Sequence, residues 1–183
     1  LRRNLVYIGR PGRSMDEASY IPPPPAELPA LLSNWEKYVN ANEDEDPLVI
    51  AAVSHYQFEA IHPFMDGNGR IGRILIPIIL FQKKYLNYPF LYLSEYFERR
   101  RDDYISQLRT KDRDGNWEDW INFFLLSVTN QAAGAQQKAF NMLTLYKEKK
   151  EIIDSFNSRY AMKLLDILFS NPVVSYSMVK RSM

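Results

Sequence analysis

Two strongly apolar segments that flank a short glycine-containing stretch constrain the fold more than any other feature. Residues 48–61 are almost continuously apolar and follow Pro47, a residue that favours the first turn of a helix. Residues 70–86 are again mostly apolar, and Pro77 within them removes one helical hydrogen bond and predicts a bend. Helices that are apolar on all sides are usually buried, so both segments are predicted core helices.

The rest of the chain adds further helices and one β-hairpin. Apolar periodicity predicts helices over residues 28–40 and 94–108, and another from Trp117 into the 150s, with Asn116 as its N-cap and a bend at Gly134. Residues 5–21 begin with a β-prone run that meets Gly and Pro breakers and leads into four prolines. We interpret them as a β-hairpin flap, and the fold class as all-α with this one hairpin; a disordered N-terminal tail is the alternative.

Composition excludes several classes of protein. The chain has 183 residues with 23 basic and 22 acidic side chains, so its net charge of +1 gives no overall attraction to nucleic acid or membranes. The sequence contains no cysteine, which excludes disulfides and thiol chemistry, and it has no apolar run long enough to span a membrane. A cytoplasmic location fits this composition. Because the sequence does not begin with Met, we read it as a piece of a longer protein.

The stretch between the two apolar segments carries the candidate chemistry. It reads His62-Pro63-Phe64-Met65-Asp66-Gly67-Asn68-Gly69-Arg70-Ile71-Gly72-Arg73. A Gly-Asn-Gly loop before a helix can turn backbone N–H groups inward as an anion-binding nest, and the helix N-terminus adds its dipole. Arg70 and Arg73 lie on one side of the first helical turn and suit a polyphosphate. Asp66 offers an oxygen ligand for Mg²⁺, and His62 offers an imidazole base.

Each of these features has an ordinary structural explanation when it stands alone. A histidine at a helix end is more often structural, and Gly-Asn-Gly is more often a plain turn. Two arginines usually form a solvated face, and a single Asp usually caps a turn. Their ordered combination within one short stretch favours phosphoryl or nucleotidyl transfer.

The stretch resembles the signature of the Fic family, His-Pro-Phe-x-(Asp/Glu)-Gly-Asn-Gly-Arg-x-x-Arg, at every specified position. Residues 6–9 and 21–23 are similar to the family's flap and its exit. Residues 91–98 and 117–125 look like its bacterial branch with a C-terminal winged-helix domain. The resemblance covers roughly residues 4–150 and implies a Fic domain over residues 1–150. Residues 151–183 would then form a C-terminal helix and the start of a truncated winged-helix domain, or a loose terminal helix.

The resemblance also implies roles for individual residues. His62 would take the proton from a target hydroxyl, and Asp66 would hold Mg²⁺ between the α- and β-phosphates of ATP. Arg70 would support the β-phosphate and Arg73 would clamp the γ-phosphate. The other nucleotide-binding positions would be Gly67, Asn68, Gly69, Ile71, Gly72, Arg100 and Tyr104. Arg100 and Ile105 depart from the residues that similar family members often carry, so Arg100 and Tyr104 could equally belong to a charged helix surface.

Partners follow from the same resemblance. The flap would hold a target protein by strand addition. The chain lacks the family's inhibitory hexapeptide (Ser/Thr)-x-x-x-Glu-(Gly/Asn), which would come from preceding sequence in cis or from an antitoxin-like partner. A homodimer is possible in this scheme, and nucleic acid would bind only if a winged-helix domain follows.

The predicted function is transfer of AMP from Mg-ATP to a Ser, Thr or Tyr hydroxyl of a target protein. One alternative keeps the fold and changes the donor, giving a phosphotransferase or a phosphocholine transferase. Kinase-like relatives tend to carry Lys in the middle of the nest, whereas this chain keeps Gly67-Asn68-Gly69. Another alternative is a non-catalytic DNA-binding or adaptor protein, and the intact His62, Asp66 and Arg73 argue against it.

Overall fold

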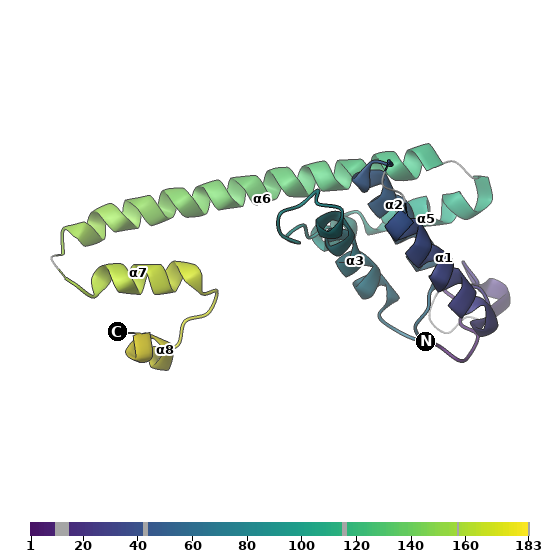
Figure 1. Cartoon of the computed structure of the whole chain (residues 1–183), viewed down its shortest axis with the longest axis horizontal. Coiled ribbons are helices and arrows are strands. Elements are labelled where there is room, and N and C mark those ends of the chain that lie inside the picture. Colours follow the sequence, from purple (N-terminus) through teal and green to yellow (C-terminus); the bar gives the residue numbers. More distant parts are fainter. Residues whose placement is uncertain (10–14, 42–43, 115–116, 157, 183) are drawn as a thin grey trace. The chain divides into compact units, whose positions relative to one another are not determined.

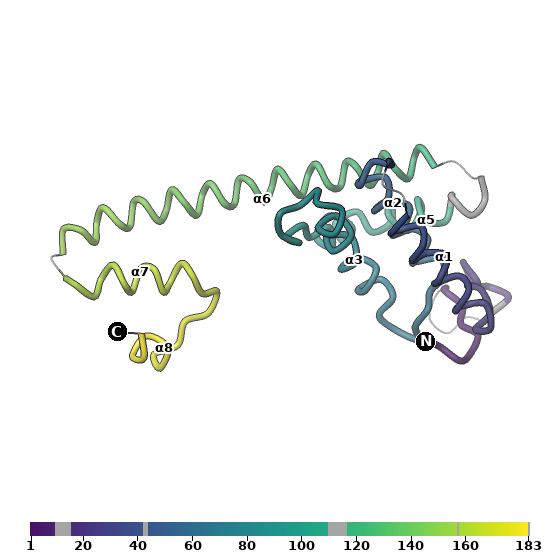
Figure 2. The backbone as a smooth tube through the Cα atoms, in the orientation of Figure 1, coloured from purple at the N-terminus to yellow at the C-terminus, as the bar shows by residue number. Residues whose placement is uncertain are grey.

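The protein is described by a computed structural model that covers residues 1–9, 15–41, 44–114, 117–156 and 158–182. Its helices are joined by short connections (Figures 1 and 2). Two short 3-10 helices come first, η1 (Met15–Glu17) and η2 (Pro25–Glu27). They are followed by α1 (Leu28–Ala41), α2 (Pro47–Ile61), α3 (Asn68–Gln82), α4 (Ser94–Arg99), α5 (Arg101–Asp114), α6 (Trp117–Asp154), α7 (Ala161–Ser170) and α8 (Tyr176–Ser182).

Helix α2 lies at the centre of the core, as its apolar sequence predicts. It packs against both α1 and α3 (Figure 1). The Asp46 side chain accepts a hydrogen bond of 2.8 Å from the N–H of Leu48 and so caps the helix, with Pro47 in its first turn. The indole N–H of Trp120 on α6 donates a 2.9 Å hydrogen bond to the carbonyl of Ala52, and both residues are completely buried. This bond satisfies the polar atom of the largest buried side chain.

Three predicted elements differ from the structure. Helix α3 begins at Asn68, so the end of the glycine stretch belongs to its first turn. The helix predicted over residues 94–108 is divided into α4 and α5 at Arg100, whose φ of −119° and ψ of 43° are not helical. Helix α6 runs through Gly134 without interruption. Residue Asn116, the predicted N-cap, lies outside the described residues.

The regular β-hairpin predicted over residues 5–21 is not found among the described residues, which contain no strand. One antiparallel bridge joins Ile8 to Tyr20 instead, with backbone hydrogen bonds of 2.8 and 3.1 Å between them. Helix η1 occupies part of the returning segment, and a 3-10 turn cannot continue a β ladder. The intervening residues 10–14 lie outside the described residues.

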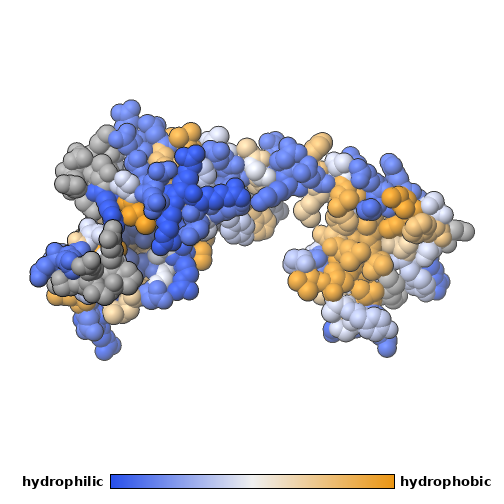
Figure 3. All heavy atoms as spheres, turned by 180° about the vertical axis from the view of Figure 1, so that it is seen from behind, coloured by the Kyte–Doolittle hydropathy of each residue, from blue (hydrophilic) through white to orange (hydrophobic). Residues whose placement is uncertain are grey.

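The chain forms two compact units, Leu1–Ala132 and Ala133–Met183, which divide within α6. The first contains α1 to α5 and all of the candidate site. In the second, Tyr146 of α6 packs edge-on against Phe169 of α7 and donates a 2.7 Å hydrogen bond to Asp166. Figure 3 shows apolar side chains gathered on one face of this unit, whose exposed apolar residues include Phe140 and Leu143. No helix in the described ranges is both long and apolar enough to cross a membrane.

Candidate active site

His62 ends α2 in a left-handed conformation. Its φ is 49° and its ψ is 60°, and its N–H donates a 3.0 Å hydrogen bond to the carbonyl of Phe58. This conformation costs a residue with a Cβ about 1–2 kcal/mol, so the surrounding contacts must maintain it. Pro63 follows and lacks the N–H that another helical turn would need.

The contacts that maintain it come from Arg2, which is 3% exposed. The Arg2 N–H donates to the carbonyl of Pro63 at 2.9 Å, and its Nε donates to the carbonyl of His62 at 2.8 Å. Its Nη2 also donates to the carbonyls of Ile61 and Pro23. Burial lowers the pKa of Arg2, but a guanidinium bonded to several carbonyls keeps its charge. Arg2 therefore fastens the chain on both sides of His62, and no sequence motif indicated this role.

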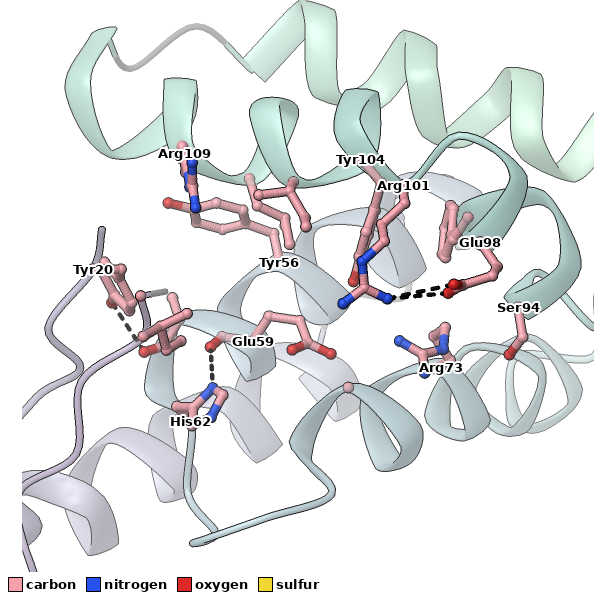
Figure 4. Close-up of a pocket in the computed structure, with 17 residues that line it drawn as sticks. Tyr20, Tyr56, Glu59, His62, Arg73, Ser94, Glu98, Arg101, Tyr104 and Arg109 are labelled. Carbon is pink, nitrogen blue, oxygen red and sulfur yellow. Dashed lines mark hydrogen bonds and ion pairs between the residues drawn. The ribbon is translucent and has the colours of Figure 1, made fainter. Parts of the chain in front are cut away.

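The His62 ring is oriented by its own helix. Its Nδ1 lies 3.3 Å from the carbonyl oxygen of Glu59 (Figure 4). A carbonyl can only accept, so Nδ1 carries the proton in this contact and Nε2 keeps its lone pair. Partial burial lowers the pKa of His62 below its ordinary value, which keeps the imidazole neutral at pH 7. A neutral imidazole with a free Nε2 can act as a general base.

Asn68 braces the loop through its side chain. The side-chain oxygen accepts from the N–H of Phe64 at 2.8 Å, and the side-chain nitrogen donates to the carbonyl of Phe64 at 2.8 Å. Asn68 is 2% exposed, so losing either bond would leave a buried polar atom unpaired. Because both polar atoms of its side chain are bonded to Phe64, Asn68 can contribute only its backbone N–H to phosphate binding.

The anion-binding groups lie slightly further along the chain than the sequence suggests. The N–H of Gly67 is already bonded to the Asp66 carboxylate at 2.6 Å, and Gly67 itself has a φ of 85° that favours glycine. The first hydrogen bond of α3 runs from the N–H of Ile71 to the carbonyl of Gly67 at 3.0 Å. The N–H groups of Asn68, Gly69 and Arg70 precede it and have no partner within the helix. Together with the helix dipole they form the candidate phosphate site.

Asp66 and Arg70 form an ion pair of 3.0 Å at the surface, with side chains 90% and 71% exposed. Exposed pairs contribute little to stability, so either partner can exchange the other for a ligand at low cost. Mg²⁺ usually takes one or two carboxylates and completes its shell with phosphate oxygens and water. The exposed Asp66 carboxylate beside the N-terminus of α3 fits that requirement.

A cavity of about 370 Å³ lies between α2, α3, α4 and α5, next to the N-terminal segment (Figure 4). Four predicted site residues line it: His62, Gly69, Arg73 and Tyr104. The others are not among its lining residues: Asp66, Gly67, Asn68, Arg70, Ile71, Gly72 and Arg100. The cavity therefore brings the candidate base together with the first turn of α3 and its second arginine.

Tyr104 forms part of the cavity wall and is only 7% exposed. Its hydroxyl lies 2.9 Å from Nε2 of the buried His55. Burial raises the pKa of Tyr104, so it remains a neutral phenol. Arg100 lies at the break between α4 and α5, where its guanidinium is 5.4 Å from the Tyr96 ring centre and 3.8 Å from Asp103. Both residues were predicted to bind the nucleotide, but Tyr104 lines the cavity and Arg100 does not.

Several residues that line the cavity were not predicted from the sequence: Tyr20, Tyr56, Glu59, Glu98, Arg101 and Arg109. Glu59 could have been suspected, because it is a charged residue in a nearly apolar helix and lies one turn before His62. Arg101 is paired with Glu98 at 3.2 Å on the cavity wall (Figure 4). The family resemblance pointed to Arg100 and Tyr104, but no local signal connects the other residues of 98–109 with the cavity.

A histidine base, an anion-binding helix N-terminus and an arginine that face one cavity define a candidate site for chemistry on phosphate esters. Residues 2–80 match the model of the Fic/DOC family. A crystal structure of a Fic family protein from Desulfovibrio desulfuricans G20 superposes with a TM-score of 0.64 at 30% identity, covering 75% of this chain and 41% of that one. Both matches support a Fic/DOC family domain in this chain.

Curated relatives point in the same direction. The chain is 37% identical over 86 residues to the protein adenylyltransferase Fic of Drosophila melanogaster, a match that covers 46% of this chain and 16% of that protein. It is 39% identical over 92 residues to a probable protein adenylyltransferase of Aquifex aeolicus, covering 50% of this chain and 26% of that protein. The chain thus matches no more than about a quarter of the length of these relatives.

Proposed function

We propose that this domain is a protein adenylyltransferase that transfers AMP from ATP to a side-chain hydroxyl of a target protein. The observation that carries the proposal is that His62, Gly69 and Arg73 line the same cavity. AMP transfer requires the base and the phosphate-binding groups to lie within reach of one reacting phosphorus, because positioning provides much of the rate enhancement in such reactions. The relatives named as adenylyltransferases support the same activity.

In the proposed reaction, the target hydroxyl oxygen attacks the α-phosphorus of ATP. The bond from that phosphorus to the oxygen bridging to the β-phosphate breaks, and pyrophosphate leaves. Nε2 of His62 takes the hydroxyl proton. The N–H groups at the start of α3 and the Arg73 guanidinium hold the phosphates and balance the charge that develops on their oxygens.

Mg²⁺ would bind at Asp66, with the phosphate oxygens completing its shell. When bound, it would supply neutralisation of phosphate charge. Arg70 would then be released from its ion pair with Asp66 and become available to the β-phosphate. Breaking the Asp66–Arg70 ion pair requires little free energy because both side chains are exposed.

The target would approach along the N-terminal segment. Ile8, Gly9 and Tyr20 line the cavity next to His62, and the Ile8–Tyr20 bridge gives this segment a partly extended backbone. An extended target segment added alongside would present one hydroxyl to the base without extensive reading of sequence. The remaining predictions stand beside this proposal: a bacterial, cytoplasmic protein of the winged-helix branch, an inhibitory Glu supplied in cis or by a partner, and a homodimer.

Separate incubations with α-labelled and γ-labelled ATP test the proposal. Label that reaches protein only from the α position, and that disappears with His62→Ala, is the expected result. General-base removal typically costs about 10²–10⁴ in rate. Transfer from the γ position would establish the phosphotransferase alternative, and transfer that survives His62→Ala would exclude His62 as the base.

A further inference from the structure

Glu59 places a carboxyl in the cavity wall that the proposed reaction does not use. It lies on α2 one turn before His62, and its Oε1 is buried with no hydrogen-bond partner among the described residues. A Cβ on Gly72 would overlap that oxygen. The carboxyl therefore fits against α3 at a position where only glycine leaves room for it.

The charge of this carboxyl depends on Arg73. Burial raises the pKa of Glu59 to about 7, and the positive charge of Arg73 acts in the opposite direction. Figure 4 shows the Glu59 carboxyl pointing along the cavity toward Arg73. The other titratable groups around it are His55, Tyr56 and His62 on α2, Glu98 on α4, Arg101, Tyr104 and Arg109 on α5, and Tyr20 in the N-terminal segment. Arg73 is the charged group with the largest effect on it.

Phosphate binding must change the balance between the charged and the neutral form of the Glu59 carboxyl. A nucleotide phosphate bound by Arg73 would offset the positive charge that favours the Glu59 carboxylate and would add negative charge to the same cavity. Both effects favour the neutral carboxyl, because like charges disfavour each other's ionised forms and burial already disfavours this one. The proton required comes from solvent.

We propose that Glu59 takes up a proton when nucleotide phosphates bind in the cavity that it lines together with Arg73, and that it thereby sets how nucleotide affinity depends on pH. The proposal rests on the proposed function only in that the cavity binds a nucleotide. In the unprotonated form the negative charge of Glu59 opposes that of the phosphates in the same cavity. In the protonated form this repulsion is absent, so nucleotide affinity falls as pH rises above neutrality.

Calorimetric titration with Mg²⁺ and a non-hydrolysable ATP analogue, in buffers that differ in ionisation enthalpy, measures the proton uptake. At pH 7.5 a group with a pKa near 7 is mostly ionised, so the wild-type protein should take up roughly 0.7 proton per nucleotide. Between pH 6 and pH 8 its Kd should weaken about tenfold. Glu59→Gln mimics the neutral carboxyl and should remove both the proton uptake and that slope. Its Kd at pH 8 should be several-fold tighter than that of wild type.

Glu36→Gln is the matched control, because Glu36 is exposed on α1 and does not line the cavity. It should behave as wild type. A structural role for Glu59 would change stability or affinity equally at every pH and leave the proton uptake intact, which would overturn the proposal. So would wild-type uptake below about 0.2 proton, even if Glu59→Gln failed to fold. A folded wild-type protein that binds no nucleotide would instead contradict the proposed function itself.

Discussion

Replacing Gly69 with alanine should stabilise the fold and weaken nucleotide binding at the same time. Gly69 lies in the first turn of α3, and a Cβ built on it would be 2.9 Å from Nη1 of Arg73. The backbone φ of Gly69 is not positive, so alanine can adopt the helical conformation there. The strained contact is with the end of a flexible side chain, and Arg73 can move away from it.

The two effects have different magnitudes. Replacing a helical glycine with alanine at a compatible site contributes about 0.4–1 kcal/mol to stability. A displaced Arg73 loses a charge-assisted hydrogen bond to phosphate, worth about 1.5–3 kcal/mol. Since 1.4 kcal/mol corresponds to a factor of ten, nucleotide affinity should fall at least about tenfold.

Urea unfolding and calorimetric titration of the same Gly69→Ala preparation measure both quantities. Gly134→Ala is the matched control, because Gly134 is also helical and an added Cβ there would meet nothing within 4 Å. It should give a similar gain in stability with unchanged affinity. An affinity within twofold of wild type in a folded, stabilised Gly69→Ala protein would refute the argument that Arg73 must occupy this space.

Three further changes probe the rest of the site. Asn68→Ala should lower the free energy of unfolding by about 2–3 kcal/mol, because two partly buried backbone groups of Phe64 lose their partners, and urea unfolding should detect it. Asp66→Ala should change stability by less than about 0.5 kcal/mol, since its ion pair is exposed, yet reduce transfer to a low level that added Mg²⁺ does not restore. Full wild-type activity in excess chelator would contradict the metal assignment. Burial lowers the pKa of His55 to about 4, so the folded protein favours the neutral imidazole. The stability that neutral His55 contributes is present above pH 6.5 and is lost as the pH falls toward 4. Glu59, whose pKa is raised, changes stability in the opposite direction over this range. Urea unfolding of Glu59→Gln should therefore reveal a loss of about 2–3 kcal/mol between pH 7 and pH 4.5, and a flat profile would contradict the burial argument for His55.

The sequence predicted those parts of the fold that depend on local pattern. The apolar run of residues 48–61 is helix α2 at the centre of the core, and Pro47 and Asp46 begin it as helix-start chemistry requires. Local pattern was not sufficient to predict whether residues 5–21 form a regular hairpin. Its β-prone run is short, and pairing of one residue on each side forms only a bridge. Strand formation depends on neighbours that local propensity does not specify.

The break at Arg100 shows what periodicity cannot detect. Eight residues from α4 and α5 line the cavity with helical spacing across the break: Ser94, Phe97, Glu98, Arg101, Tyr104, Ile105, Leu108 and Arg109. A single non-helical residue left the spacing of these side chains intact, so the periodicity predicted one continuous helix. The same pattern gave no reason to place these side chains against His62, because this contact depends on how distant segments pack.

The candidate site therefore combines two kinds of residue. Those from His62 to Arg73 are contiguous, and a short motif reveals them because a loop and a helix N-terminus bind phosphate through local geometry. Arg2 and Glu59 act through packing instead. Arg2 holds the backbone of His62 from a distant part of the chain, and Glu59 fits against Gly72 on the next helix. Gly72 stands at a position that the family signature leaves unspecified, and the carboxyl that it accommodates explains why this chain has glycine there. A residue within the stretch can therefore owe its identity to a partner outside it.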